Sequence, residues 1–135
     1  MLLSEIVALS RNITETQSRI EKIGLLSACL RRLAPDEIEV GVNYLAGRPR
    51  QRNVGIGPAL LDAASPGRSA ERATLTLLQV DEAFARMTRT TGAGSASERR
   101  RVLAELMETA TTDEQRFLGR LALGELRQGA LEGIM

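Results

Sequence analysis

The chain has 135 residues and a net charge of +1, and its composition excludes several kinds of chemistry. It contains no histidine and a single lysine, Lys22, so histidine acid–base catalysis is impossible and a zinc site with the usual ligands is nearly excluded. No run of about 18 apolar residues could span a membrane, and the N-terminus lacks the positive start of a signal peptide. We therefore expect a soluble protein that is not exported and has no membrane partner.

The charges are distributed unevenly along the chain. Residues 48–101 carry ten cations and five anions, against five and six before them and three and six after them. Seventeen of the 18 cations are arginines, whose planar guanidinium suits bidentate phosphate contacts. A genome that favours arginine codons would explain the same bias. The middle of the chain therefore has a net charge of +5, from either cause.

Helical spacing of apolar residues predicts one long helix from Thr14 to Leu33. Its buried side would consist of Ile20, Ile23, Leu26, Leu30 and Leu33. Cys29 lies in the same apolar stretch, and we expect it to be an inert core residue. A second helix should begin at the break around Pro35 and end at Gly47. Its apolar residues are Ile38, Val42 and Leu45.

The apolar period disappears between Gly47 and Gly57, which predicts a loop. A short helix over residues 58–64 and a surface linker over residues 65–69 should follow. No segment has the alternation of a buried strand, although residues 73–77 could briefly extend.

Three further helices are predicted in the second half of the chain. Thr76 and Gln79 have capping-box spacing before a helix over residues 77–89. Two similar pairs should open the next two helices, and Gly124 should end the last one. These pairs are Ser95 with Glu98 and Thr112 with Gln115. The expected architecture is all-α: a single compact domain, residues 1–135, of about six helices without a sheet.

The loop contains candidate phosphate contacts. Arg48, Arg50 and Arg52 alternate between glycines, so their side chains can spread over a surface without pairing with helix neighbours. Gly55 and Gly57 flank the start of the next helix, where free amides favour an anion; a tight turn that needs positive φ explains them as well. Arg99, Arg100 and Arg101 open a later helix, and they either bind an external anion or form a solvated face.

A second candidate site follows the last predicted helix. Gly124 and Gly129 flank Arg127 and Gln128, so the backbone can approach a phosphate closely while a cation holds it. Arg127 could instead pair with a neighbouring glutamate.

Five landmarks of this chain, taken in order, resemble the N-terminal DNA-binding domain of ATP-dependent DNA ligases, most closely the actinobacterial type. They are TQSRIEKI at residues 16–23, Ala34-Pro35 with YLAG at residues 44–47, RNVGIG at residues 52–57, GAGS with the following arginines at residues 92–101, and Glu114 and Phe117 with GELRQG at residues 124–129. The resemblance implies an all-helical domain that binds the backbone and minor groove of nicked duplex DNA in repair, replication or recombination. It also implies a bacterial, cytoplasmic protein associated with the nucleoid.

The resemblance also implies what the chain does not do. It lacks the K-x-D-G motif that carries the ligase nucleophile, so we expect no enzymatic activity from it alone and no cofactor within it. ATP and magnesium would belong to separate nucleotidyltransferase and OB domains. The expected partners of this chain are therefore those domains and nicked duplex DNA. The family's domain continues for several helices beyond Met135, so the chain resembles a truncated piece whose exposed apolar faces could self-associate.

Two other functions remain open. A helical protein–protein interaction module would use the apolar faces to bind a partner, with the arginines serving solubility. A helix-turn-helix regulator would need a recognition helix with several Arg, Asn or Gln residues after a short turn, and none is obvious.

Overall fold

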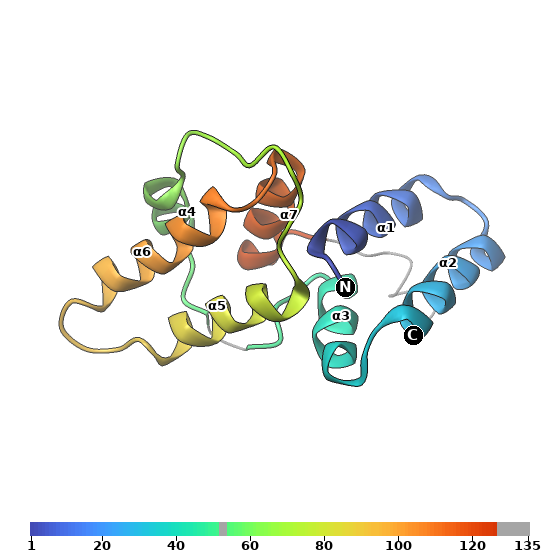
Figure 1. Ribbon diagram of the computed structural model, residues 1–135, viewed down its shortest axis with the longest axis horizontal. Helices are drawn as coiled ribbons and strands as arrows, with labels where there is room; N and C mark the ends of the chain where they lie inside the picture. Colours follow the sequence, from blue (N-terminus) through green and yellow to red (C-terminus); the bar gives the residue numbers. More distant parts are fainter. Residues whose placement is uncertain (52–53, 127–135) are drawn as a thin grey trace.

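The computed structural model describes residues 1–51 and 54–126, in which every regular element is a helix (Figure 1). The elements are α1 (Leu3–Glu15), α2 (Arg19–Arg32), the 3₁₀ turn η1 (Pro35–Glu37), α3 (Ile38–Leu45), α4 (Pro58–Ala64), α5 (Leu77–Arg89), α6 (Ser95–Glu108) and α7 (Thr112–Leu123). The prediction of an all-α fold is confirmed, with seven α-helices in these residues where about six were expected. None of the described helices is long and apolar enough to cross a membrane.

The first long helix predicted from the sequence is in fact two helices. α1 ends at Glu15, and α2 begins after Ser18, whose hydroxyl accepts a hydrogen bond from the Glu21 amide at 3.3 Å. α1 was not predicted, although its buried residues have helical spacing. They are Leu3, Ile6, Leu9 and Ile13. The single-helix prediction was wrong because Ser18 is an N-cap, and the chain is extended on both sides of the break.

The buried side of α2 also differs from the prediction. Ile20 is 82% exposed, and Ile23 and Leu30 are each 41% exposed, whereas Leu26, Cys29 and Leu33 are buried. α2 packs against α1 and α3, so only a narrow stripe of it is covered. The expected burial of Cys29 is correct, and that burial raises the pKa of its thiol.

α3 presents a different face to the core from the one predicted. Tyr44, Val40 and Leu45 are buried, but Ile38 is 45% exposed, so the prediction held fully only for Leu45. Gly41 lies on the buried side and permits close packing, because a Cβ at this position would lie 2.8 Å from Cδ1 of Leu33 at the end of α2. The Tyr44 ring then meets Phe84 of α5 edge to face, with centroids 6.4 Å apart.

The second half of the chain packs α6 against α4 and α5, while α7 lies against α1 (Figure 1). A short antiparallel contact joins the two halves: the Leu3 amide donates to Leu75 O at 2.8 Å, and the Leu77 amide donates to Met1 O at 3.1 Å. This agrees with the expected extension of residues 73–77. One apolar cluster runs through the described helices and positions the loop between α3 and α4.

Four caps were predicted in the second half of the chain, of which two are right and two are wrong, while the predicted bounds of α4 agree with the structure. The capping box of Thr76 and Gln79 opens α5, and Gly124 ends α7 with φ +71°. α6 instead begins after Gly94 at φ +79°, and the Glu98 side chain pairs with Arg101 instead of closing a box. The box that opens α7 is shifted by one residue, to Thr111 and Glu114. The Thr111 amide donates to the Glu114 carboxylate at 2.8 Å, whereas the Gln115 side chain donates to Met107 O at 2.8 Å and is not available for a cap.

Candidate nucleic-acid interface

The first part of the loop between α3 and α4 is held by Asp81 of α5. Arg50 donates to the two Asp81 carboxylate oxygens at 3.0 and 2.9 Å, and Gln51 Nε2 donates to Oδ1 at 2.8 Å. Arg50 therefore pairs with a helix, contrary to the expectation that the loop arginines spread without pairing. Arg48 is exposed and has no ion pair among the described residues. Arg52 lies outside the described residues.

The second part of the loop is held by Arg99 of α6. Its Nη2 donates to Val54 O at 3.1 Å and to Gly55 O at 2.8 Å. Gly55 has φ +77°, and a Cβ there would lie 1.3 Å from Arg99 Nη2. The backbone conformation favours glycine at this place, and any side chain would also displace the Arg99 guanidinium. Sequence reasoning missed this role, because nothing in the spacing of residues 55 and 99 indicates the contact.

Gly57 differs from Gly55. Its φ is −106°, so it makes no left-handed turn and the expectation of positive φ was wrong for this residue. It is the N-cap of α4, and Pro58 follows at the first helical position without an N–H group. α4 thus offers fewer free amides to an anion than the sequence suggested.

The three arginines at the start of α6 have separate environments. Arg99 lies against the loop carbonyls, and Arg101 donates to Glu105 at 2.7 Å and also pairs with Glu98. The Arg101 guanidinium holds the pKa of Glu98 below its ordinary value. Arg100 is exposed.

The start of the loop and the end of α7 lie side by side. Gly47 has φ +89°, and a Cβ at this position would be 2.5 Å from the carbonyl oxygen of Leu126. Gly124 has open space around it. Two segments predicted as sites from distant parts of the sequence therefore meet, while Arg127, Gln128 and Gly129 lie outside the described residues.

A shallow depression lies where the loop meets α7. It is lined by Pro49, Gln51, Val54, Gly55, Ile56, Gly57 and Ala122. Among the described residues, this lining offers backbone groups, small apolar surfaces and one amide, and it contains no carboxylate, thiol or hydroxyl. Such a surface is suited to binding the backbone of an extended ligand. It is not suited to acid–base or nucleophilic chemistry.

Comparison with known proteins identifies the family. The family model described as "DNA ligase N terminus" matches residues 62–135. The chain belongs to this family. Proteins described as "Probable DNA ligase" align with the whole chain: one from Anaeromyxobacter sp. (strain K) is 49% identical, one from Rhodococcus opacus (strain B4) 44%, and one from Sorangium cellulosum (strain So ce56) 43%. The chain spans about a quarter of the length of these relatives, 27%, 27% and 26% respectively.

The family assignment confirms the resemblance read from the sequence. The family model begins within α4 and so includes α5, α6 and α7, but not the loop at residues 47–57. The loop of this DNA ligase N-terminal chain nevertheless aligns with the relatives named above, because their alignments cover every residue of the chain.

Proposed function

We propose that the chain binds nicked duplex DNA without sequence preference, through the phosphate backbone and the minor groove, as the N-terminal segment of an ATP-dependent DNA ligase. The ligase would act in DNA repair, replication or recombination, at the bacterial nucleoid. The chain itself would have no catalytic activity and no cofactor. ATP and magnesium would be bound by those parts of the ligase that lie outside this chain.

The observation that carries the proposal is the meeting of the loop and the end of α7. Gly55 and Gly124 have positive φ and are exposed, so the backbone there has no side chain that would keep a ligand away, whereas Gly47 is buried against Leu126 and brings the two segments together. Exposed Arg48 follows Gly47, Arg52 belongs to the same loop, and Arg127 follows Leu126 in the sequence. Contacts from backbone and arginine fix a position on DNA but do not read its sequence, as a protein that acts at any nick requires.

The test is binding of fluorescein-labelled nicked and intact duplexes of unrelated sequence, measured by anisotropy at two salt concentrations. We expect wild type to bind nicked duplexes with a steep salt dependence and little difference between sequences. Arg48→Gln should lower the slope of log K against log [salt] by about 0.9, the value for one lost phosphate contact. Arg72→Gln, an exposed arginine remote from the loop in sequence, is the matched control and should change nothing.

Two results would overturn the proposal. One is an absence of salt-sensitive binding by wild type even at low salt. The other is equal binding by the Arg48→Gln, Arg52→Ala and Arg127→Ala variants and by wild type. A preference for one duplex sequence over another would favour a regulator instead.

A protein-interaction module is the second candidate, and the exposed side of α2 favours it. Ile20 is 82% exposed, and Ile23 and Leu30 are 41% exposed on the same helix. An apolar surface of this kind suits contact with another part of the ligase or with a second copy of the chain. Sedimentation velocity of wild type and Ile20→Ser separates these occupants, because only self-association makes the wild-type sedimentation coefficient rise with concentration and the variant's stay constant.

A further inference from the structure

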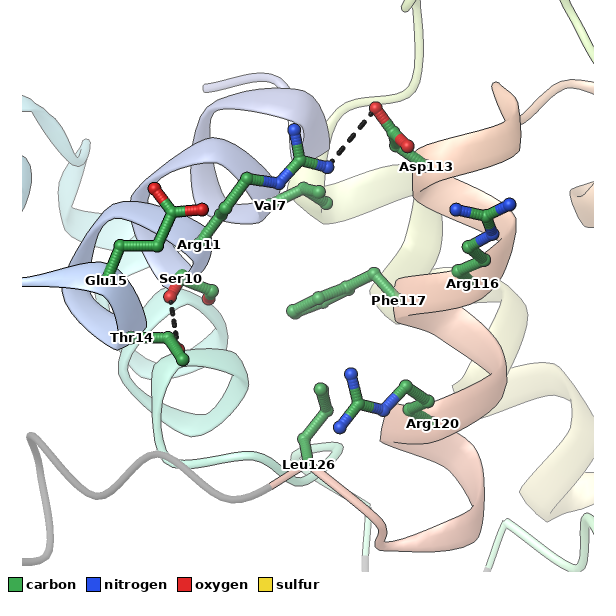
Figure 2. Close-up of a pocket in the computed structure, with 10 residues that line it drawn as sticks. All are labelled: Val7, Ser10, Arg11, Thr14, Glu15, Asp113, Arg116, Phe117, Arg120 and Leu126. Carbon is green, nitrogen blue, oxygen red and sulfur yellow. Dashed lines mark hydrogen bonds and ion pairs between the residues drawn. The ribbon is translucent and has the colours of Figure 1, made fainter.

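A groove lies between α1 and α7 (Figure 2). It is close to the loop at residues 47–57, which we call the loop interface. Side chains one turn apart line each wall, among them Ser10 and Thr14 on α1 and Phe117 and Arg120 on α7. Figure 2 shows the Phe117 ring and the Arg120 guanidinium reaching from α7 toward α1. Leu126 closes one end, and its carbonyl is the group that lies next to Gly47. The groove therefore adjoins the loop.

The groove contains more positive than negative charge. Among the described residues, three arginines and two carboxylates line it, and Arg11 pairs with Asp113 at 3.3 Å. In the part of the chain that the structure describes, Arg116 and Arg120 have no carboxylate partner. Two guanidinium groups on one helix face, one turn apart, are thus available to an external anion.

The hydroxyl of Ser10 is a second, independent feature of the groove. Ser10 is only 6% exposed, and its Oγ has no hydrogen-bond partner among the described residues. A serine within a helix commonly bonds to the carbonyl one turn before it, but this one does not, although Thr14 makes that bond to Ser10 O at 2.9 Å. Buried hydroxyls in native proteins are almost always paired, so this one requires a partner that the described residues do not supply.

We propose that the groove holds a phosphate group of the nucleic-acid backbone, contacted by Arg116 and Arg120, and that its entry shifts the side chains that cover the Ser10 hydroxyl so that this hydroxyl donates to it as well. A phosphodiester has the negative charge and the acceptor oxygens to satisfy two guanidinium groups and one hydroxyl together. Its neighbouring sugar would pack on Phe117 and Leu126, the apolar part of the lining. The inference rests on the proposed function and extends it, because a strand held at the loop continues past Leu126 into this groove.

The first experiment compares Arg116→Gln and Arg120→Gln with the Arg72→Gln control in the anisotropy assay on nicked duplex. Each groove variant should bind about tenfold more weakly, as expected for the loss of one charge-assisted hydrogen bond. The salt slope should fall by about 0.9 for each variant. Arg120→Lys keeps the charge and should retain the slope, and thermal unfolding midpoints should be unchanged because both arginines are exposed.

Ser10→Ala distinguishes ligand binding from a structural role. Removing a buried, unpaired hydroxyl should raise the unfolding midpoint, while the lost contact should weaken DNA binding about threefold. A purely structural serine would not produce these opposite changes. Unchanged binding by Ser10→Ala would remove the hydroxyl from the site.

A free phosphate shares the chemistry of the backbone, so the second experiment separates the two sources. The ¹⁵N-labelled chain is titrated with nicked duplex or with inorganic phosphate at equal ionic strength, and the Nε–Hε signals of Arg116 and Arg120 are followed. We expect a shift with duplex and none with phosphate alone. An equal shift with inorganic phosphate would overturn the nucleic-acid assignment.

Failure of the groove can be told from failure of the proposed function. If both groove variants bind like the Arg72→Gln control while Arg48→Gln binds more weakly, the groove proposal is wrong and the loop interface stands. If wild type does not bind nicked duplex at all, the proposed function is wrong and the groove proposal is overturned with it.

Discussion

Replacing Gly55 with alanine should destabilise the chain far more than the same change at Gly57. The backbone at Gly55 has φ +77°, and the new Cβ would meet Arg99 Nη2 at 1.3 Å. The guanidinium must then leave, so its hydrogen bonds to Val54 O and Gly55 O are lost. Gly57→Ala is the matched control, because its φ is −106° and nothing lies within 4 Å of the added Cβ.

The cost has two parts. An alanine in the left-handed region costs about 1 kcal/mol. Loss of the two charge-assisted hydrogen bonds adds about 1–2 kcal/mol in total, less than the usual sum for two such bonds because the released guanidinium and the Gly55 carbonyl regain water. The free energy of unfolding should therefore fall by about 2–3 kcal/mol, and the unfolding midpoint by about 10 °C for a chain of this size.

A double-mutant cycle with Arg99→Ala tests the reasoning by urea unfolding followed by circular dichroism. Arg99→Ala alone removes the hydrogen bonds and should cost about 1–2 kcal/mol. In that background Gly55→Ala should cost only the backbone term of about 1 kcal/mol, which gives a clear coupling energy. The contact is refuted if Gly55→Ala costs the same with and without Arg99, or no more than Gly57→Ala.

Other predictions concern single side chains. Tyr44→Phe should stabilise the chain by about 1 kcal/mol in urea unfolding, because the hydroxyl is fully buried and has no partner among the described residues; destabilisation would reveal a partner. Asp81→Asn should cost about 1 kcal/mol and tighten DNA binding at low salt, since it frees the charge of Arg50; weaker binding would mean that loop position outweighs charge. Cys29 should react with a disulfide reagent only as the chain unfolds, and wild type should lose stability relative to Cys29→Ala as pH rises above the ordinary thiol pKa, because burial raises that pKa; fast labelling of the folded chain would contradict its burial.

The helices were predictable from the sequence because their apolar residues recur with helical period, and caps such as Thr76 mark where they begin. The buried face of a helix was predictable only where several other helices pack around that helix. Leu103 and Leu118 face the core as their spacing indicates, since α6 and α7 each pack against other helices. On α2 and α3 the prediction was only partly right, since Leu26, Leu33 and Leu45 are buried but several of the other residues are exposed. The close approach of Gly41 to Leu33 is a tertiary contact that no periodic pattern contains.

In the candidate site, too, some features were predictable from the sequence and others depend on tertiary packing. Glycines at special backbone positions can be recognised in a sequence, and Gly55 and Gly124 have positive φ. The groups that hold the loop in place cannot be recognised, because Asp81 and Arg99 are far from it in the chain. Both belong to helices on which charged residues are common, and their partners become evident only from tertiary packing.

Because distant side chains hold the loop in place, they should affect how a DNA interface formed by backbone groups responds to mutation. The proposed surface has few charges of its own, so its affinity depends on the position of the loop relative to the end of α7. Three contacts fix that position: Asp81 with Arg50, Arg99 with the carbonyls at residues 54 and 55, and Gly47 with Leu126. A misplaced backbone loses several phosphate contacts together, whereas a lost arginine removes one. We therefore expect Arg99 and Gly47, which need not touch DNA, to be more sensitive positions for binding than exposed Arg48.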